Sequence, residues 1–496
     1  MKTRNQPLDV LIIGAGISGI GAACHLTRQC PGKRFAILER RQEIGGTWSL
    51  FNYPGIRSDS DMYSFGFQFR PWTEPKILAD GPSIRAYVNA TAAEYDVPRH
   101  IRFGRKVLRA SWSSEEALWT VDAATDDGEA ETYTARFLIG CTGYYNYDQG
   151  YRPEFPGEKD FKGQIVHPQF WPKDLDYSGK RVVIIGSGAT AITLVPSMAP
   201  DAEHVTMLQR SPTYILSVPS IDKLAAGLQK WLPSKLAYKL NRSRNILLAR
   251  GLFEFSRRRP DAMRRFLLGR VKKQIGAHAD MRHFTPRYNP WDERLCVVPS
   301  GDLFKAIRAG KASVETDHID TFTPDGIRLK SGQELKADII VTATGLQVQM
   351  LGGSEMVVDG KPIQPREHML YKGVLMQDVP NAAMIVGYTN ISWTLKVDIA
   401  CEYLCRLIKH MDAKGYRTAV PRDDEGCMDQ NNTILGALSS GYVMRAAATL
   451  PRQGTQSPWQ MSQNYLRDVP ELRYGKIEDG KLRFDDMAKA AIRNAA

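Results

Sequence analysis

Two short apolar runs, each followed by closely spaced glycines, organise the first half of the chain. The first run is 9–13, and a glycine-rich turn and a helical stretch to about Cys30 follow it. The second run is 181–185, followed by a similar turn and a helical stretch to about Met198. Continuous apolar runs bounded by turn residues are typical of strands buried in a parallel sheet. The pattern therefore predicts an α/β fold with two strand–turn–helix units.

A third region has a different period. From Leu224 to Leu236 apolar residues recur every three or four positions, interrupted at Pro233, and the recurrence continues to about Gly276. This spacing predicts amphipathic helices. Between residues 221 and 290 there are seventeen Lys and Arg against four Asp and Glu, whereas the whole chain carries a net charge of +12. The basic character of the protein therefore belongs to this one segment.

The seven cysteines and the N-terminus exclude several classes of protein. No CxxC pair occurs, and Cys401 and Cys405 have the spacing of one helix face, so we expect no disulfide framework and a reducing compartment. Lys2 and Arg4 before an apolar stretch resemble a signal peptide, but Asp9 and four glycines interrupt that stretch. No run of eighteen apolar residues exists. We therefore expect a cytoplasmic protein.

The turn after the first run matches the GxGxxG pattern of dinucleotide-binding folds. The first glycine permits a tight turn, the second lets the backbone approach a pyrophosphate, and the third lets helix and strand pack closely. Glu39 follows the motif by twenty residues, at the end of the run 35–38. A carboxylate there accepts hydrogen bonds from ribose hydroxyls and repels a 2′-phosphate, which favours FAD or NAD. The alternative is an exposed glutamate at a strand end. The predicted residues of this motif are Gly14, Gly16, Ser18 and Gly19.

The second turn matches GxGxxA, a permitted variant of the same pattern. Arg210 and Ser211 follow it by about the same interval, at the end of the run 204–209. A cation with a hydroxyl suits the 2′-phosphate of NADP, although a solvated strand-end charge is the alternative for Arg210. The chain therefore combines an acidic and a basic site, which indicates FAD plus NADPH. The predicted residues of this motif are Gly186, Ser187, Gly188, Ala189, Thr190 and Ala191.

These units predict two interleaved nucleotide-binding domains, because 496 residues are too many for one compact core. We assign 1–145 and 346–496 to an FAD-binding domain, and 146–220 and 291–345 to an NADPH-binding domain. Residues 221–290 form a basic helical insertion.

Two longer patterns carry a resemblance to a known family. They are Gly46-x-Trp48-x₄-Tyr53-Pro54-Gly55-x₃-Asp59 and Phe161-x-Gly163-x₃-His167-x₃-Trp171-Pro172. Both are similar to the fingerprints of type I Baeyer–Villiger monooxygenases, which belong to the flavoprotein monooxygenases. Related flavin monooxygenases usually carry a smaller aromatic residue in place of Trp171. The segments 290–296 and 386–390 resemble the subgroup that includes the ethionamide-activating monooxygenases.

The resemblance implies a reaction and two residues for it. In this family NADPH reduces FAD, oxygen forms a peroxyflavin, and a ketone becomes an ester or lactone; sulfides are also oxidised. Arg294 falls where the family places the cation that stabilises the peroxide anion in a dry site. Asp59 falls where the family places a buried carboxylate that orients this arginine. The alternatives are a surface arginine in a loop and a turn cap in Ser58-Asp59-Ser60.

Other positions follow from the same resemblance. We expect Gly46, Thr47 and Trp48 to lie near the flavin, and Val107 to offer backbone groups to the adenine. His167 more readily fits a role in coupling the domains than that of a general base. Glu293 departs from the family, in which many members carry lysine, and this predicts a weaker preference for NADPH.

Several questions stay open at this stage. Flavin-containing N- or S-monooxygenases, an NADPH-dependent flavin reductase, and a non-enzymatic membrane-surface protein are the alternative functions. The basic insertion fits either a solvated helix face or peripheral association with an anionic membrane, where each cation contributes about 1 kcal/mol. Nucleic acid is not an expected partner, because no recognition motif accompanies the charge. The substrate within the ketones and sulfides, and the oligomeric state, are not specified by these patterns.

Overall fold

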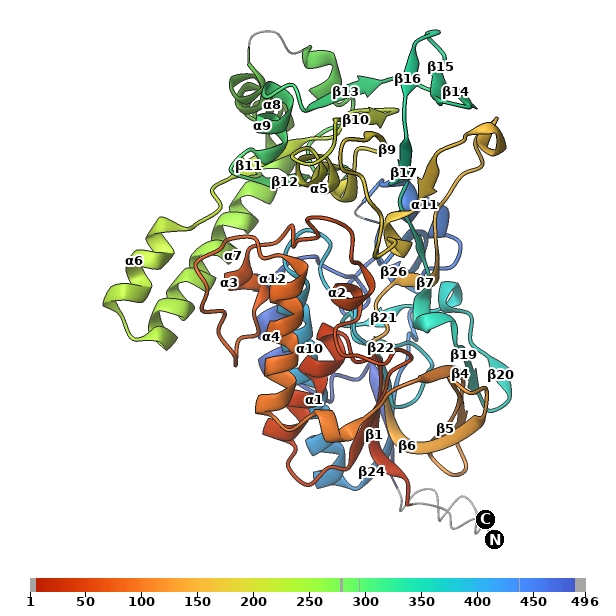
Figure 1. Ribbon diagram of the computed structural model, residues 1–496. Coiled ribbons are helices and arrows are strands. Elements are labelled where there is room, and N and C mark those ends of the chain that lie inside the picture. The colour runs from red at the N-terminus through yellow and green to blue at the C-terminus, as the bar shows by residue number, and fades with distance from the viewer. Residues whose placement is uncertain (1–5, 277–279, 294, 437, 487–496) are drawn as a thin grey trace.

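The structure is a computed structural model that describes residues 6–276, 280–293, 295–436 and 438–486. Two large sheets lie toward opposite ends of the molecule, each covered by helices, and a helical hairpin projects from one side (Figure 1). This confirms the predicted α/β fold.

The first sheet has eleven strands and is parallel at its centre. β1 (Leu8–Ile13) lies between β2 (Phe35–Leu38) and β6 (Ala130–Gly140), with Ile12 opposite Ile37. The strand order is β20-β19-β4-β5-β6-β1-β2-β3, and β21, β22 and β23 join through β6. The other strands are β3 (Ile101–Arg102), β4 (Arg105–Ser113), β5 (Leu118–Thr125), β19 (Glu355–Val358), β20 (Lys361–Pro362), β21 (Leu370–Tyr371), β22 (Leu375–Met376) and β23 (Ala382–Met384).

Helices α1 (Ile17–Gln29) and α10 (Trp393–Lys414) pack against each other beside this sheet (Figure 1). The interior of α10 is buried and includes Cys401 and Cys405, as their spacing predicts. All seven cysteines, each in a described segment, are free and buried. Further helices are α2 (Thr47–Leu50), α3 (Met62–Phe65), α4 (Gly81–Glu94), α9 (Asp302–Arg308), α11 (Gly441–Ala446) and α12 (Tyr465–Tyr474).

The second sheet is entirely parallel, in the order β13-β10-β9-β17-β8. Its central strand β9 (Arg181–Ile185) leads into α5 (Ala189–Met198), as the second glycine turn predicts. Val183 lies opposite Thr206 on one side and Ile340 on the other. The other strands are β8 (Gln164–Val166), β10 (His204–Gln209), β13 (Ala312–Thr316) and β17 (Ile339–Thr342).

The basic segment is helical, as its periodicity predicts. It forms α6 (Lys223–Trp231), α7 (Ser234–Arg258) and α8 (Pro260–Ile275), and Pro233 separates the first two. Helix α6 and the start of α7 form the projecting hairpin of Figure 1. Two parallel strands, β11 (Ile215–Val218) and β12 (Cys296–Pro299), flank the segment.

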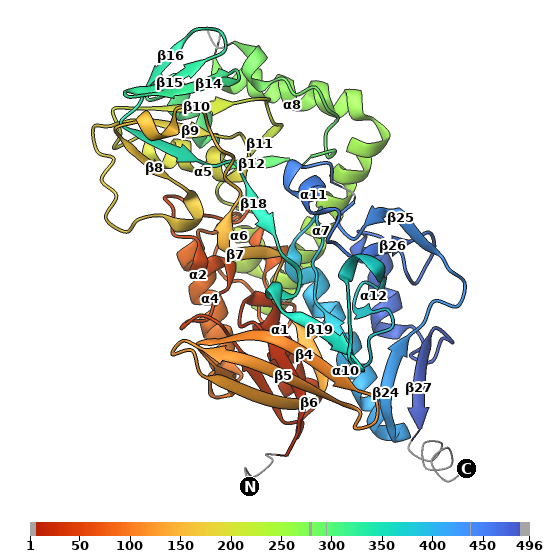
Figure 2. The same ribbon diagram turned by 90° about the vertical axis from the view of Figure 1, so that its right-hand side faces the viewer.

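The connections between the two sheets include the antiparallel pair β7 (Tyr145–Gly150) and β18 (Leu346–Val348), visible in Figure 2. His167 packs against this pair, since a Cβ added at Gly150 would lie 2.0 Å from its Cε1. Burial lowers the pKa of His167. A largely neutral, packed imidazole fits the structural role expected from the sequence.

In the described ranges no helix is long and apolar enough to cross a membrane.

The remaining elements complete the two ends of the molecule. The remaining strands are β14 (Ile319–Thr323), β15 (Gly326–Leu329), β16 (Glu334–Lys336), β24 (Tyr416–Pro421), β25 (Met428–Thr433), β26 (Arg452–Gly454) and β27 (Leu482–Asp486). Short 3₁₀ helices occupy Pro98–His100, Glu158–Asp160, Pro168–Phe170, Met281–Phe284, Met350–Gly353 and Pro365–Glu367.

Candidate active site

A cavity of about 320 Å³ opens at the carboxyl end of β1. Its walls come from the first glycine turn, the segment after α2, the start of β4 and the start of α10. Apolar residues of β11, α7 and the start of β12 complete them. Many of the residues predicted from the sequence line it. They are Gly14, Gly16, Ser18, Glu39, Gly46, Thr47, Trp48, Asp59 and Val107.

The first glycine turn is too crowded for side chains. Gly14 has a φ of +101°, and an added Cβ there would lie 2.6 Å from the carbonyl oxygen of Cys141. At Gly19 an added Cβ would lie 1.8 Å from the carbonyl oxygen of Gly14, which explains the close contact of α1 with the turn. Gly16 precedes α1 and supplies no side-chain cap. The free N–H groups and dipole of this helix end favour an anion such as a pyrophosphate.

Gly46 brings a second backbone segment next to the first glycine turn. An added Cβ at Gly46 would lie 2.9 Å from the Cα of Gly16, so the two backbones approach each other directly. Thr47 and Trp48 follow in α2. Trp48 meets Phe65 edge to face, with ring centroids 5.8 Å apart. The segment thus extends the wall of the cavity from the glycine turn to an aromatic surface.

Glu39 is a buried wall residue, with a side chain only 4% exposed. One carboxylate oxygen accepts the backbone N–H of Ala15 at 2.7 Å, and the other accepts the N–H of Arg41 at 2.9 Å. Burial raises the pKa of Glu39, while these two hydrogen bonds lower it. The alternative of an exposed strand-end glutamate is therefore wrong. The carboxylate is fixed in orientation beside the glycine turn, where a ribose acceptor is required.

Aromatic rings from distant parts of the chain form another wall. Tyr144 stacks on Trp393, with centroids 5.3 Å apart and planes 24° from parallel. The indole N–H of Trp393 donates to the hydroxyl of Ser18 at 2.8 Å. Ser18, predicted to bind the cofactor, therefore also positions this ring. Sequence reasoning did not select Tyr144 or Trp393, although the quoted segment 386–390 leads directly to α10.

Val107 lies near the start of β4, where the ladder to β5 is irregular. The register between the two strands shifts between Val107 and Arg109. Such a bulge leaves a residue outside regular pairing. Val107 lines the cavity here, together with Lys106. The position suits backbone recognition of a planar base, as the family resemblance implies.

The segment from Gly46 to Asp59 runs from the first glycine turn to α5, the helix that follows the central strand of the second sheet. Tyr53 is buried and shares a hydrogen bond with the Thr190 side chain, and burial raises the pKa of Tyr53 to about 12. An added Cβ at Gly55 would lie 1.8 Å from the hydroxyl of Ser197. The fingerprint pattern therefore corresponds to a tight contact between the two nucleotide-binding units.

Asp59 lines the cavity and is exposed to it, while the neighbouring Ser58 is buried. The expected role of Asp59 as the carboxylate that orients Arg294 stays a prediction. The hydroxyl of Ser58 accepts the N–H of Ser60 at 3.0 Å and so closes the turn itself. Both Ser58 and Asp59 line the cavity. Arg294, the predicted catalytic partner, lies outside the described residues.

The second glycine turn lies outside this cavity, at the carboxyl end of β9. Gly186 has a φ of +138°, and an added Cβ would lie 2.3 Å from the carbonyl oxygen of Ala343. Ser187 donates its hydroxyl to the carbonyl oxygen of Ser211 at 3.0 Å. Gly188 and Ala189 are exposed at the start of α5, and a Cβ at Gly188 would meet nothing within 4 Å. Ala191 is buried against the sheet.

Two charged side chains lie close enough to Arg210, which follows β10, for its charge to act on them. Arg210 is exposed beyond β10, and its charge acts on Glu293, whose pKa burial raises. Arg445 on α11 places its guanidinium 3.4 Å from the ring centroid of Tyr151. Partial burial and the Arg210 charge lower the pKa of Arg445. Sequence reasoning missed Arg445, because no motif marks its position in the C-terminal third of the chain.

Comparisons with known proteins agree with this arrangement. The chain is 55% identical over 480 residues to "Probable FAD-binding monooxygenase AlmA" of Acinetobacter sp, covering 97% of this chain and 96% of the relative. It is 52% identical over 481 residues to "FAD-containing monooxygenase EthA" of Mycobacterium tuberculosis, covering 97% and 98%. A solved structure of oxidised steroid monooxygenase bound to NADP matches with a TM-score of 0.77 at 22% identity, covering 97% and 100%. That likeness concerns the fold.

The family itself follows from a match over most of the chain. Residues 8–412 match the family described as "FMO-like: Flavin-binding monooxygenase-like". The recognition of a flavin monooxygenase from the two fingerprints and the two glycine turns is thereby confirmed. This chain belongs to the flavin-binding monooxygenase-like family.

Proposed function

We propose that this protein is an FAD-containing, NADPH-dependent Baeyer–Villiger monooxygenase that converts ketones to esters or lactones and also oxidises sulfides. The observation that carries the proposal is the cavity, in which a dinucleotide-type glycine turn and an apolar wall meet. The polar end holds Gly14, Gly16 and Glu39. The apolar end includes Leu252 and Leu295.

The polar end fits FAD. The uncapped start of α1 suits the pyrophosphate, Glu39 suits the ribose hydroxyls, and Val107 suits the adenine. The stacked pair Tyr144 and Trp393 offers a flat surface for the flavin ring. Glycines at the turn support this fit, because side chains there would collide with backbone atoms.

The second turn fits NADPH. The exposed start of α5 at Gly188 suits a pyrophosphate, and Arg210 with Ser211 suits the 2′-phosphate. Arg445 is a second cation for the same phosphate, since it lies close enough to Arg210 for their charges to interact. Glu293 opposes this attraction, so we expect a moderate preference for NADPH over NADH.

Oxygen transfer to a substrate requires polar and apolar side chains between the proposed FAD site and the proposed NADPH site. When bound, FAD reduced by NADPH supplies the activated oxygen that is inserted into the substrate. Asp59 and Arg294 are the proposed polar residues at this point, with Arg294 stabilising negative charge and Asp59 orienting it. Apolar side chains of the wall, such as Leu216 and Leu252, exclude water and accept an apolar substrate.

The test is oxygen labelling with purified holoenzyme. Linear ketones, cyclic ketones and aryl sulfides are each incubated with NADPH and ¹⁸O₂, and products are identified by mass spectrometry. We expect one labelled oxygen in an ester, lactone or sulfoxide for each NADPH consumed. Oxidation of NADPH with hydrogen peroxide as the sole product across the panel would instead identify a flavin reductase. Labelled sulfoxides or N-oxides without any ester would identify an N- or S-monooxygenase.

A further inference from the structure

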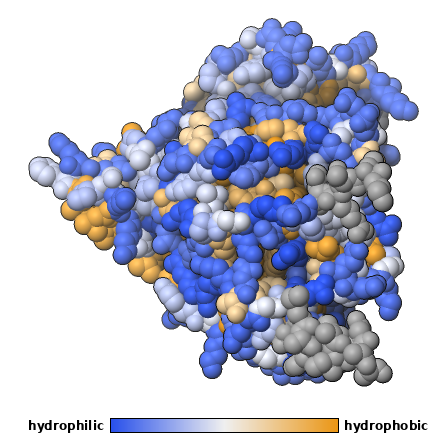
Figure 3. Space-filling model, turned by 90° about the horizontal axis from the view of Figure 1, so that it is seen from below, coloured by the Kyte–Doolittle hydropathy of each residue, from blue (hydrophilic) through white to orange (hydrophobic). Residues whose placement is uncertain are grey.

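The projecting hairpin of α6 and α7 exposes an unusual number of large apolar side chains. On α6, Trp231 is 81% exposed, and Leu224 lies seven positions earlier, on the same face of the helix. Most exposed large apolar residues of soluble proteins occur singly and need no explanation. Here they gather on one hairpin, and Figure 3 shows hydrophobic and hydrophilic residues side by side on the projecting part.

Helix α7 continues this surface along its outer face. Leu236, Leu240 and Leu247 are exposed and share one face of a helix with about 3.6 residues per turn. Leu248 and Phe255 are also exposed and lie beside that face. We call these five residues, with Leu224 and Trp231, the apolar stripe.

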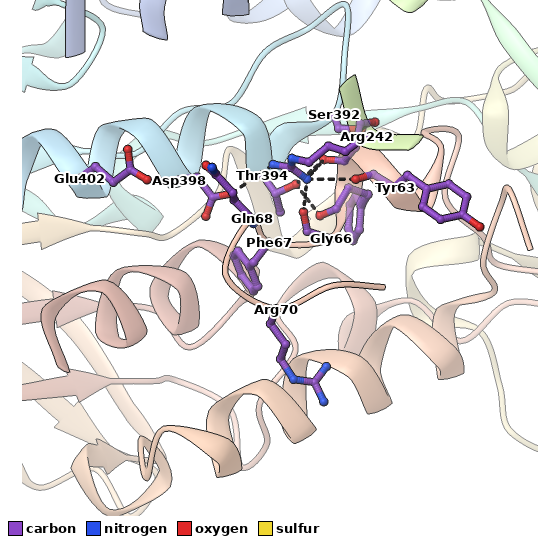
Figure 4. A network of polar contacts seen from close by, with 12 residues as sticks. Tyr63, Gly66, Phe67, Gln68, Arg70, Arg242, Ser392, Thr394, Asp398 and Glu402 are labelled. Atoms are coloured by element: carbon purple, nitrogen blue, oxygen red, sulfur yellow. Dashed lines mark hydrogen bonds and ion pairs between the residues drawn. The ribbon is translucent and has the colours of Figure 1, made fainter. Parts of the chain in front are cut away.

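The inner face of α7 packs against the rest of the protein. The α7 residues of the apolar stripe lie away from this face and are exposed to solvent. Arg242 is buried and donates to the backbone carbonyls of Tyr63 at 3.0 Å and Ser64 at 3.1 Å (Figure 4). Its other terminal nitrogen pairs with buried Asp398 at 3.2 Å. Removing either partner of such a buried pair is costly, which makes this contact a rigid mount.

Lysines accompany the apolar stripe on α6 and at the start of α7. Lys223, Lys230, Lys235 and Lys239 are exposed, and they make no ion pair within the described ranges. Lys230 lies 5.8 Å from the ring of Trp231. By contrast, the acids Asp222 and Glu254 of the same segment are already paired with arginines. Free positive charge next to exposed apolar side chains is the composition of helices that lie on anionic bilayers.

We propose that the apolar stripe and its lysines dock the enzyme on an anionic membrane surface. A second copy of this chain is a poorer occupant, because it would bring the same positive charges face to face. If the proposed function is right, docking also serves the reaction. Leu252 lines the cavity and lies on α7 one turn after exposed Leu248. One helix therefore joins the membrane-facing surface to the cavity that would receive an apolar substrate.

The test measures co-sedimentation of the FAD-loaded enzyme with vesicles. One set is phosphatidylcholine alone, and the other is phosphatidylcholine mixed with phosphatidylglycerol. We expect binding to the mixed vesicles at low salt and its loss as salt rises. The double variant Lys230→Gln, Lys235→Gln should bind about thirtyfold more weakly, since each cation near the surface contributes about 1 kcal/mol.

Matched variants separate this surface from general effects. Trp231→Ser should also weaken binding, whereas Tyr474→Ser, which removes a 78% exposed aromatic residue from α12, should not. Equal binding by these two variants, or no binding of the wild type at low salt, overturns the proposal. Self-association that Trp231→Ser abolishes in lipid-free sedimentation would assign the stripe to a second copy and also overturn it. Flavin content and turnover of a water-soluble ketone report on the proposed function independently of lipid.

Discussion

The two glycine turns have related sequence patterns, GxGxxG and GxGxxA, but different surroundings. The first opens into a cavity of about 320 Å³ beside a buried carboxylate, and the second lies at an exposed helix start near Arg210. Contacts on many sides slow dissociation, whereas a ligand on an open face leaves more readily. The difference supports the proposal that the first turn holds FAD as a resident cofactor and that the second binds NADPH, which exchanges.

The largest effect should follow from closing the first turn. Gly19→Ala would place a Cβ 1.8 Å from the carbonyl oxygen of Gly14, so α1 must move away from the turn. We expect loss of bound flavin, measured as the ratio of flavin to protein absorbance, and a lower melting temperature.

The matched control for this substitution is Gly269→Ala on α8, where an added Cβ meets nothing within 4 Å. Alanine is favoured over glycine inside a helix by about 0.5–1 kcal/mol, so this variant should be slightly more stable and fully flavinated. Full flavin content in Gly19→Ala would show that the first turn does not hold FAD.

The next largest effect concerns the chemistry between the two sites. Arg294→Ala should form ester about a hundred- to a thousandfold more slowly, the usual cost of losing one charge-stabilising group. Flavin content and reduction by NADPH should persist, because both dinucleotide sites are intact. Stopped-flow reduction and product yield separate these steps. Arg287→Ala, which removes an exposed arginine of the same region, should behave as wild type; unchanged ester formation in Arg294→Ala would refute its assignment.

A smaller and selective effect is expected at the open site. Arg210→Ala should weaken NADPH binding by about ten- to a hundredfold, since a charge-assisted hydrogen bond contributes about 1.5–3 kcal/mol. NADH binding should change little, because it lacks the 2′-phosphate. Arg445→Ala should show the same selectivity with a smaller loss. Titrations of both nucleotides measure these affinities, and equal losses for NADPH and NADH would exclude phosphate recognition by either arginine.

The smallest effect tests the acid beside Arg210. Glu293→Gln should tighten NADPH by about two- to fivefold, the scale of a partly screened charge contact. Burial raises the pKa of Glu293, so its carboxylate neutralises at a higher pH than an ordinary glutamate. As pH falls through that pKa, the repulsion of the phosphate fades and the wild type should approach the variant in its ratio of NADPH to NADH affinity. A constant difference between the two proteins down to acidic pH would contradict this account.

The sequence predicted what depends on neighbouring residues. The strands, glycine turns and Glu39 follow from local pattern, because backbone crowding at Gly14 and Gly19 leaves no alternative residue. The three insertion helices follow from periodicity. These features need no knowledge of how distant segments meet.

The site residues that the sequence patterns did not identify depend on contacts between segments far apart in the chain. Trp393 and Tyr144 are about half the chain apart in sequence, and Arg445 on α11 comes close to Arg210 near the second turn. The hydroxyl of Ser58 makes the hydrogen bond of the turn beside Asp59, a choice that the residue types alone do not decide. The domain limits and the catalytic roles of Asp59 and Arg294 stay predictions.

Cys141 has a bearing on how long such an enzyme keeps working. This residue lines the cavity, and burial raises the pKa of its thiol far above the ordinary value. Peroxide attacks the thiolate rather than the protonated thiol. If the proposed function is right, burial therefore disfavours the reactive thiolate at a cysteine that lies beside the site of oxygen activation.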